Sequence, residues 1–94
     1  MLKELDPLLH SQLRLAVMSL LVSVEEADFV YLKEKTDATA GNLSVQLEKL
    51  LKAEYIQIRK EFVGKKTRTS CKITETGRKA LEEYVNTLKE YLHL

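Results

Sequence analysis

The spacing of apolar residues changes twice along this chain. From residue 9 to residue 53 apolar side chains recur every three or four positions, which is typical of amphipathic helices. In the segments 55–62 and 68–74 they alternate with polar residues, as in half-buried strands, and after residue 74 the helical spacing returns. This order predicts a mainly α fold with a small β-hairpin (α+β): three helices, the hairpin and a long last helix.

The first helix is predicted from a start signal. Asp6 is followed by Pro7, and aspartate is a good helix cap while proline is favoured at the first helical position. We expect the helix to begin there and to be kinked near Ser11. Its apolar residues are Leu9, Leu13, Ala16, Val17, Leu20, Leu21 and Val24.

A helix-turn-helix is predicted next. Asp28 is placed to cap a short second helix that ends near Lys35. After a three-residue connection, Thr36 to Ala38, Thr39 is placed to cap a third helix that ends at about Ala53. The inward stripe of the third helix consists of Leu43, Leu47 and Leu50. Two helices joined by so short a turn form a helix-turn-helix.

The rest of the chain predicts a hairpin and a last helix. The two alternating segments are separated by residues 63–67, which we expect to form the loop of the hairpin. Thr74 is placed to cap the last helix. The helix carries a continuous apolar seam of Leu81, Tyr84, Val85, Leu88, Tyr91 and Leu92.

Positive charge is concentrated in the hairpin. The net charge of the chain is only +1, which by itself argues against nucleic-acid binding. Residues 59–72, however, contain six cations and one anion, a sum of +5, so the other eighty residues sum to −4. These cations are Arg59, Lys60, Lys65, Lys66, Arg68 and Lys72. A charge run on an isolated hairpin is usually only solvated, but beside a helix-turn-helix it favours contact with DNA phosphates.

Composition excludes several classes of function. The 94 residues make one domain, and the longest apolar run, Leu15 to Val24, is broken by serines and too short to span a membrane, so we expect a cytoplasmic protein. The single cysteine, Cys71, excludes an internal disulfide and a multi-thiolate metal site, and we expect it to pack in a strand rather than to act as a redox sensor. No catalytic or phosphate-loop motif is present, which predicts a binding protein without cofactor or metal rather than an enzyme.

Four segments resemble the winged helix-turn-helix transcriptional regulators of bacteria and archaea, in the broad MarR and ArsR-like group. They are HSQLRLAVMSLL (10–21), GNLSVQLEKL (41–50), FVGKKTRT (62–69) and ITETGRKALEEY (73–84). The resemblance covers nearly the whole chain. It implies that residues 1–94 form a single small stand-alone domain. It implies that the third helix is a recognition helix and that residues 62–69 are the wing. The chain departs from the family pattern at Glu54, often glycine, at Thr67, often proline, and at Cys71, often aromatic.

The candidate DNA-reading residues lie at the start of the third helix. A rotation of about 100° per residue turns Gly41, Val45, Glu48, Lys49 and Lys52 outward and puts Asn42 and Ser44 on the flanks. Asn42 is suited to an adenine edge and Val45 to a thymine methyl. The candidate residues of this helix are Thr39, Gly41, Asn42, Ser44, Val45, Gln46 and Lys49, and those of the wing are Lys65, Lys66, Thr67 and Arg68. A merely solvated polar face is the alternative.

The apolar seam of the last helix predicts a homodimer on double-stranded DNA. It is longer than the core of one chain requires, so we expect the terminal segments, about residues 1–22 and 75–94, to pair about a twofold axis. The candidate interface residues are Leu5, Leu9, Leu81, Tyr84, Val85, Leu88, Tyr91 and Leu92. A monomer whose seam folds back on its own first helix is one alternative, and a winged helix that binds protein instead of DNA is another. The pattern leaves the operator sequence, repression or activation, and a small-molecule effector open.

Overall fold

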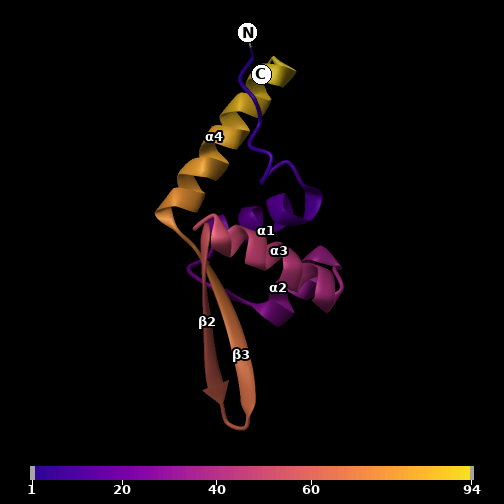
Figure 1. Cartoon of the computed structure of the whole chain (residues 1–94), viewed down its shortest axis with the longest axis vertical. Coiled ribbons are helices and arrows are strands. Elements are labelled where there is room, and N and C mark those ends of the chain that lie inside the picture. Colours follow the sequence, from indigo (N-terminus) through magenta and orange to yellow (C-terminus); the bar gives the residue numbers. More distant parts are fainter. Residues whose placement is uncertain (1, 94) are drawn as a thin grey trace.

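The computed structural model describes residues 2–93. Figure 1 shows an elongated molecule with its short helices in the middle, a long helix at one end and a hairpin at the other. Its dimensions are 54 × 25 × 21 Å. In chain order the elements are α1 (Gln12–Val22), β1 (Ala27–Asp28), α2 (Phe29–Thr36), α3 (Ala40–Lys52), β2 (Ile56–Val63), β3 (Lys66–Ile73) and α4 (Glu75–Leu92). The predicted order of three helices, hairpin and long helix is confirmed.

Helix α1 begins later than the sequence predicts. The Asp6 carboxylate accepts a hydrogen bond from the Leu8 N–H at 2.9 Å, and its carbonyl accepts from the N–H of Leu9 and His10 at 3.1 and 2.9 Å. These bonds close a local turn instead of a helix. Ser11 is then extended, with φ −150° and ψ 127°, and α1 starts at Gln12. The expectation of one kinked helix from Asp6 was therefore wrong, because the turn and the extended residue separate the two segments.

Three predicted helix caps are confirmed. The Asp28 carboxylate accepts from the Tyr31 N–H at 2.8 Å, and the hydroxyls of Thr39 and Thr74 accept from the N–H groups three residues further on at 3.1 and 2.9 Å. Each cap satisfies a donor that the first turn of a helix leaves free. The caps thus fix where α2, α3 and α4 begin.

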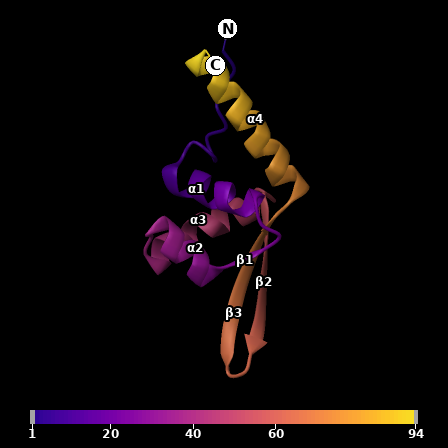
Figure 2. The ribbon, with the colours of Figure 1, turned by 180° about the vertical axis from the view of Figure 1, so that it is seen from behind.

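The sheet contains one strand that the sequence pattern did not indicate. Strands β2 and β3 are paired without interruption from Ile56 and Ile73 to Val63 and Lys66, so the loop is shorter than predicted and consists of residues 64–65, with Gly64 at φ 65°. The short β1, labelled in Figure 2, pairs with β3 on its other edge. The strand order is therefore β1-β3-β2. Two residues are too few for an alternating pattern to be recognised.

The segment that follows α3 packs tightly against the start of α4. Glu54 has φ 64°, the left-handed conformation that favours glycine, and its carbonyl accepts from the Thr74 hydroxyl at 2.6 Å. Gly77, in the first turn of α4, lies against the backbone of Tyr55, where a Cβ atom would be 2.1 Å from the carbonyl oxygen. A glycine is therefore required at position 77, and it fixes α4 against the start of β2.

Candidate nucleic-acid interface

Helix α3 presents one buried and one exposed face. Leu43, Leu47 and Leu50 are buried, as the inward stripe predicts. The predicted DNA-reading residues on the other side are exposed: Thr39, Gly41, Asn42, Ser44, Val45 and Lys49. The side chain of Val45 is 52% exposed, although Leu43 and Leu47 on the same helix are buried in the core. The packed leucines hold the exposed face in a fixed orientation.

Gln46 is placed differently from the other candidates on α3. It is half-buried, and its Oε1 accepts a hydrogen bond from Arg14 Nη1 of α1. Its Nε2 donates to Asn42 Oδ1 at 3.0 Å, and Arg14 Nε donates to the Leu8 carbonyl at 2.5 Å. Arg14 was not identified as a site residue from the sequence. A usable signal existed, because Arg14 is the one charged residue in the segment 11–24.

The four predicted wing residues, Lys65, Lys66, Thr67 and Arg68, are all exposed at the tip of the hairpin. Of the ion pairs formed within residues 2–93, none involves Lys65 or Lys66. Arg68 Nη2 lies 3.6 Å from Asp28 Oδ2. At the base of the hairpin Arg59 pairs with Glu26 at 2.7 Å. Lys65 and Lys66 therefore add positive charge to the tip that no ion pair within residues 2–93 offsets.

One face of the hairpin continues from the core to the wing. Directly paired residues point to the same side of a sheet, so Phe62 and Thr67 at the tip share a face with the buried Ile56 and Ile73. Phe62 is 81% exposed and was not identified from the sequence, where it fits the apolar alternation of a strand. An open groove joins this face to α3 and is lined by Phe29, Ser44, Leu47, Glu48, Ile58, Lys60 and Thr69. The exposed side of α3 and the inner face of the hairpin thus border the same groove.

Cys71 is fully buried in β3, and burial raises the pKa of its thiol to about 11. The thiol is therefore protonated at neutral pH, whereas a redox-sensing cysteine needs an accessible thiolate. This favours the packing role over the sensor. Among residues 2–93, no group of three or more His, Cys, Asp or Glu side chains is arranged to hold a metal ion, and no helix is long and apolar enough to cross a membrane.

The predicted dimer residues fall into two groups. Leu9, Leu81 and Tyr84 are buried within the single chain, and Leu5 and Leu88 are partly buried. The exposed apolar residues of α4 are Val85, Tyr91 and Leu92. The predicted terminal segments also include residues 1 and 94, which lie outside the described part of the chain. Only the outer part of the seam is therefore free to meet a second copy.

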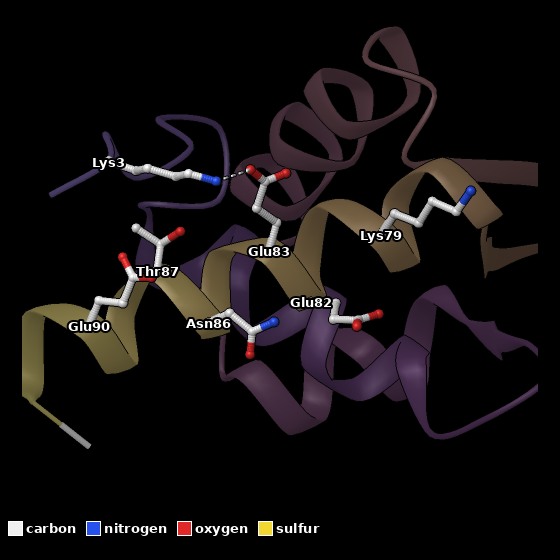
Figure 3. Close-up of a pocket in the computed structure, with 7 residues that line it drawn as sticks. All are labelled: Lys3, Lys79, Glu82, Glu83, Asn86, Thr87 and Glu90. Atoms are coloured by element: carbon white, nitrogen blue, oxygen red, sulfur yellow. Dashed lines mark ion pairs between the residues drawn. The ribbon is translucent and has the colours of Figure 1, made fainter.

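The N-terminal segment lies beside α4 (Figures 1 and 2). The Tyr91 hydroxyl donates to the Lys3 carbonyl at 2.7 Å, and Lys3 Nζ lies 3.9 Å from Glu83 Oε1 (Figure 3). Farther along, the Tyr55 hydroxyl donates to Asp6 Oδ2 at 2.6 Å. Burial and this carboxylate raise the pKa of Tyr55 to about 12, so the hydroxyl remains a donor. The polar groove beside α4 in Figure 3 carries Glu82, Glu83 and Glu90 with two lysines, and this acidic balance is unsuited to DNA.

Comparison with known proteins agrees with this architecture. The chain is similar to MJ0432, an uncharacterized protein of Methanocaldococcus jannaschii, with 36% identity over 81% of this chain and 83% of that protein. A transcriptional regulator homologue from Pyrococcus horikoshii has the same fold, with a TM-score of 0.84, 24% identity, and 92% of this chain and 85% of that chain covered.

Two structures determined with operator DNA also share the fold. A MarR variant from E. coli matches with a TM-score of 0.73 and 20% identity over 94% of this chain and 68% of that chain. PadR of Bacillus subtilis matches with a TM-score of 0.71 and 19% identity over 80% of this chain and 47% of that chain. The expected resemblance to MarR-like winged helices is confirmed at the level of fold. Residues 13–92 match the family model of the winged helix DNA-binding domain, and the chain belongs to that family.

Proposed function

We propose that this chain is a cytoplasmic transcriptional regulator that binds double-stranded DNA sequence-specifically as a homodimer. The MarR and PadR structures of the same fold were determined with operator DNA, and the Pyrococcus horikoshii protein is described as a transcriptional regulator homologue. In this chain the start of α3 enters the major groove, while the wing contacts phosphates or the adjacent minor groove.

The observation that carries the proposal is the shared groove between α3 and the hairpin. Exposed polar side chains of α3 border it on one side, and the hairpin borders it on the other and ends in Lys65 and Lys66, which form no ion pair within residues 2–93. Base edges are read by side chains held at fixed positions, whereas phosphates are bound by cations with more freedom. Both requirements are met on one surface.

Selection of bound sequences from a pool of random DNA duplexes tests this function. We expect an enriched motif made of two inverted half-sites, because a twofold dimer places its recognition helices about one DNA turn, roughly 34 Å, or a multiple apart. A single unrepeated half-site would contradict the symmetric dimer. Recovery of no motif at all would contradict sequence-specific binding.

The dimer is proposed to form through the exposed outer part of α4. Val85, Tyr91 and Leu92 remain exposed there after the N-terminal segment has covered its share of the helix, and Leu2 adds a further exposed leucine nearby on that segment. Burying these side chains against a second copy removes apolar surface from water.

Leu92→Asp tests the dimer without disturbing the core, since Leu92 is 57% exposed in the single chain. We expect light scattering at tens of micromolar to give a dimer mass for the natural chain and a monomer mass for the variant, because a carboxylate is costly to bury at an apolar interface. Val30→Asp is the matched control, because Val30 is 61% exposed on α2, away from α4. A natural chain that is monomeric with and without DNA would rule the dimer out.

A protein-binding winged helix is the second candidate, and the exposed apolar side chains at the wing favour it. Phe62 and Val63 are both exposed there. Salt distinguishes the two functions, because binding to DNA releases counterions and weakens steeply as salt rises. Absence of salt-dependent duplex binding would leave protein binding as the better account.

A further inference from the structure

A directed chain of hydrogen bonds runs from α1 to the start of α3. Arg14 on α1 is held by the Leu8 carbonyl, to which its Nε donates at 2.5 Å. Its Nη1 donates to Gln46 Oε1, and Gln46 Nε2 donates to Asn42 Oδ1 at 3.0 Å. Gln46 is half-buried, whereas Asn42 is exposed in the first turn of the helix. The exposed Asn42 amide, where this series of hydrogen bonds ends, is thus oriented by the side chains of Gln46 and Arg14 behind it.

The chemistry of arginine fixes which group donates and which accepts in each of these hydrogen bonds. A guanidinium group only donates hydrogen bonds, so Gln46 must turn its oxygen toward Arg14. The Gln46 NH2 group then faces Asn42 and requires an acceptor, which is the Asn42 oxygen. This orientation follows from donor and acceptor chemistry alone and leaves the Asn42 NH2 group as the free end. Asn42 therefore presents donors at its free end, while its oxygen is turned toward Gln46 and accepts from it with one of its two lone pairs.

We infer that Arg14 and Gln46 set the base preference of Asn42 and direct it to guanine. The inference rests on the proposed function, in which the start of α3 enters the major groove. Pairing with an adenine edge, which the sequence analysis expects, requires the Asn oxygen to accept from N6 while the NH2 donates to N7. Guanine instead presents two adjacent acceptors, O6 and N7, and needs only donors. Arg14 and Gln46 act as positioning residues, and Asn42 makes the contact.

The variant Gln46→Glu provides the test, because it reverses the direction of the hydrogen bond between residues 46 and 42. A carboxylate has no N–H, so it accepts from Arg14 with one oxygen and from the Asn42 NH2 with the other, and Asn42 then turns its own oxygen outward. The outward acceptor favours a base with a donor in the major groove, cytosine N4 or adenine N6. We expect selection from random duplexes to give guanine at one position of each half-site for the natural chain, and cytosine or adenine there for Gln46→Glu.

Three variants complete the experiment. Asn42→Ala identifies the base position that Asn42 reads, as the one whose preference is lost. Gln46→Met cannot orient Asn42 and should relax the preference at that position without reversing it. Lys52→Gln removes one positive charge from an exposed position at the other end of α3, so it matches the charge change of Gln46→Glu and should weaken binding without changing the motif.

The outcomes separate this inference from the proposed function. Adenine at the Asn42 position in the natural motif, or guanine retained by Gln46→Glu, would overturn the inference while sequence-specific binding stands. A natural chain that selects no motif would overturn the proposed function and the inference together. A shift of base confined to the Asn42 position would support it, since a general loss of structure does not change one base into another.

Discussion

The recognition helix α3 and the wing are attached to the molecule in different ways. Helix α3 is fixed by buried leucines beneath it, by the Thr39 cap at its start and by the hydrogen bond from Arg14 to Gln46. The wing, residues 62–69, extends beyond the helices and is supported mainly by its own strand pairing (Figure 1). Its residue Phe62 is 81% exposed.

The difference corresponds to two kinds of DNA contact. Reading a base requires donors and acceptors at fixed positions, and α3 provides them because its orientation is set by the core. Holding a phosphate requires positive charge in reach of a repeating backbone, and long flexible side chains at a hairpin tip suffice. We therefore expect changes in α3 to alter stability or base preference and changes in the wing to alter overall affinity.

The largest effect should come from removing the packing beneath α3. Leu43 is fully buried, and Leu43→Ala should lower the free energy of unfolding by about 2 to 5 kcal/mol, since it loses apolar contacts and leaves a cavity. Val63→Ala in the wing, where the side chain is exposed, should change it by no more than about 0.5 kcal/mol. Urea denaturation of both variants measures the contrast. Equal losses would mean that the wing is as firmly packed as the helix.

A smaller effect is expected from the exposed face of α3. Asn42→Ala should reduce discrimination between the selected site and random duplex by about 1 to 3 kcal/mol, because a base contact is lost. The slope of log affinity against log salt should remain the same, as no cation is removed. Asn86→Ala, at an exposed asparagine of α4, is the control and should leave both quantities unchanged. Unaltered discrimination in Asn42→Ala would exclude Asn42 as a reader.

The wing is expected to show the opposite pattern. Lys66→Ala should weaken binding to selected and random duplexes alike and reduce the salt slope by about 0.9, the value for one lost phosphate contact. Near 0.1 M salt this corresponds to roughly 1 kcal/mol. Lys89→Ala, an exposed lysine on α4, controls for the change in net charge. If the two variants had the same slope as the natural chain, Lys66 would not touch a phosphate.

Local signals in the sequence predicted most of the fold. Asp28, Thr39 and Thr74 cap their helices as expected, because a cap depends on residues within one turn. Asp6 carries the same signal but forms a turn, where its carboxylate also binds the hydroxyl of Tyr55, far along the chain. A contact over that distance is not visible in a local pattern.

The candidate site was predicted in outline for a similar reason. Helical spacing identifies which residues of α3 face outward, and the structure exposes Asn42, Val45 and Lys49 accordingly. Spacing does not indicate what lies behind them, so it failed to show that Gln46 is held by Arg14 from another helix. Exposure of Phe62 was missed because strand alternation predicts a face and not where the core beneath it ends.

The smallest expected effect concerns Arg68, the wing cation that forms an ion pair with Asp28. Arg68 lies 3.6 Å from Asp28, whose other oxygen caps α2 at the Tyr31 N–H. Asp28→Asn removes the charge that competes for Arg68 and retains the cap, since asparagine caps helices about as well as aspartate. Exposed ion pairs are worth little, so we expect duplex binding to tighten by no more than about 0.5 kcal/mol and the free energy of unfolding to change by a similar amount at most.

The salt slope reports whether Arg68 has moved to the DNA. In Asp28→Asn it should become steeper by no more than about 0.4, which corresponds to about 0.5 kcal/mol near 0.1 M salt, because Arg68 then displaces more counterions from the DNA, and base preference should not change. Glu26→Gln is the control, since it removes an equal charge from beside Arg59, which lies nearer the base of the hairpin, pairs with Glu26 at 2.7 Å and also lies 3.8 Å from Glu61. A steeper slope in Asp28→Asn alone would assign the added phosphate contact to the tip of the wing. Equal changes in both variants would instead indicate a general effect of net charge, and the contrast between tip and base would be lost.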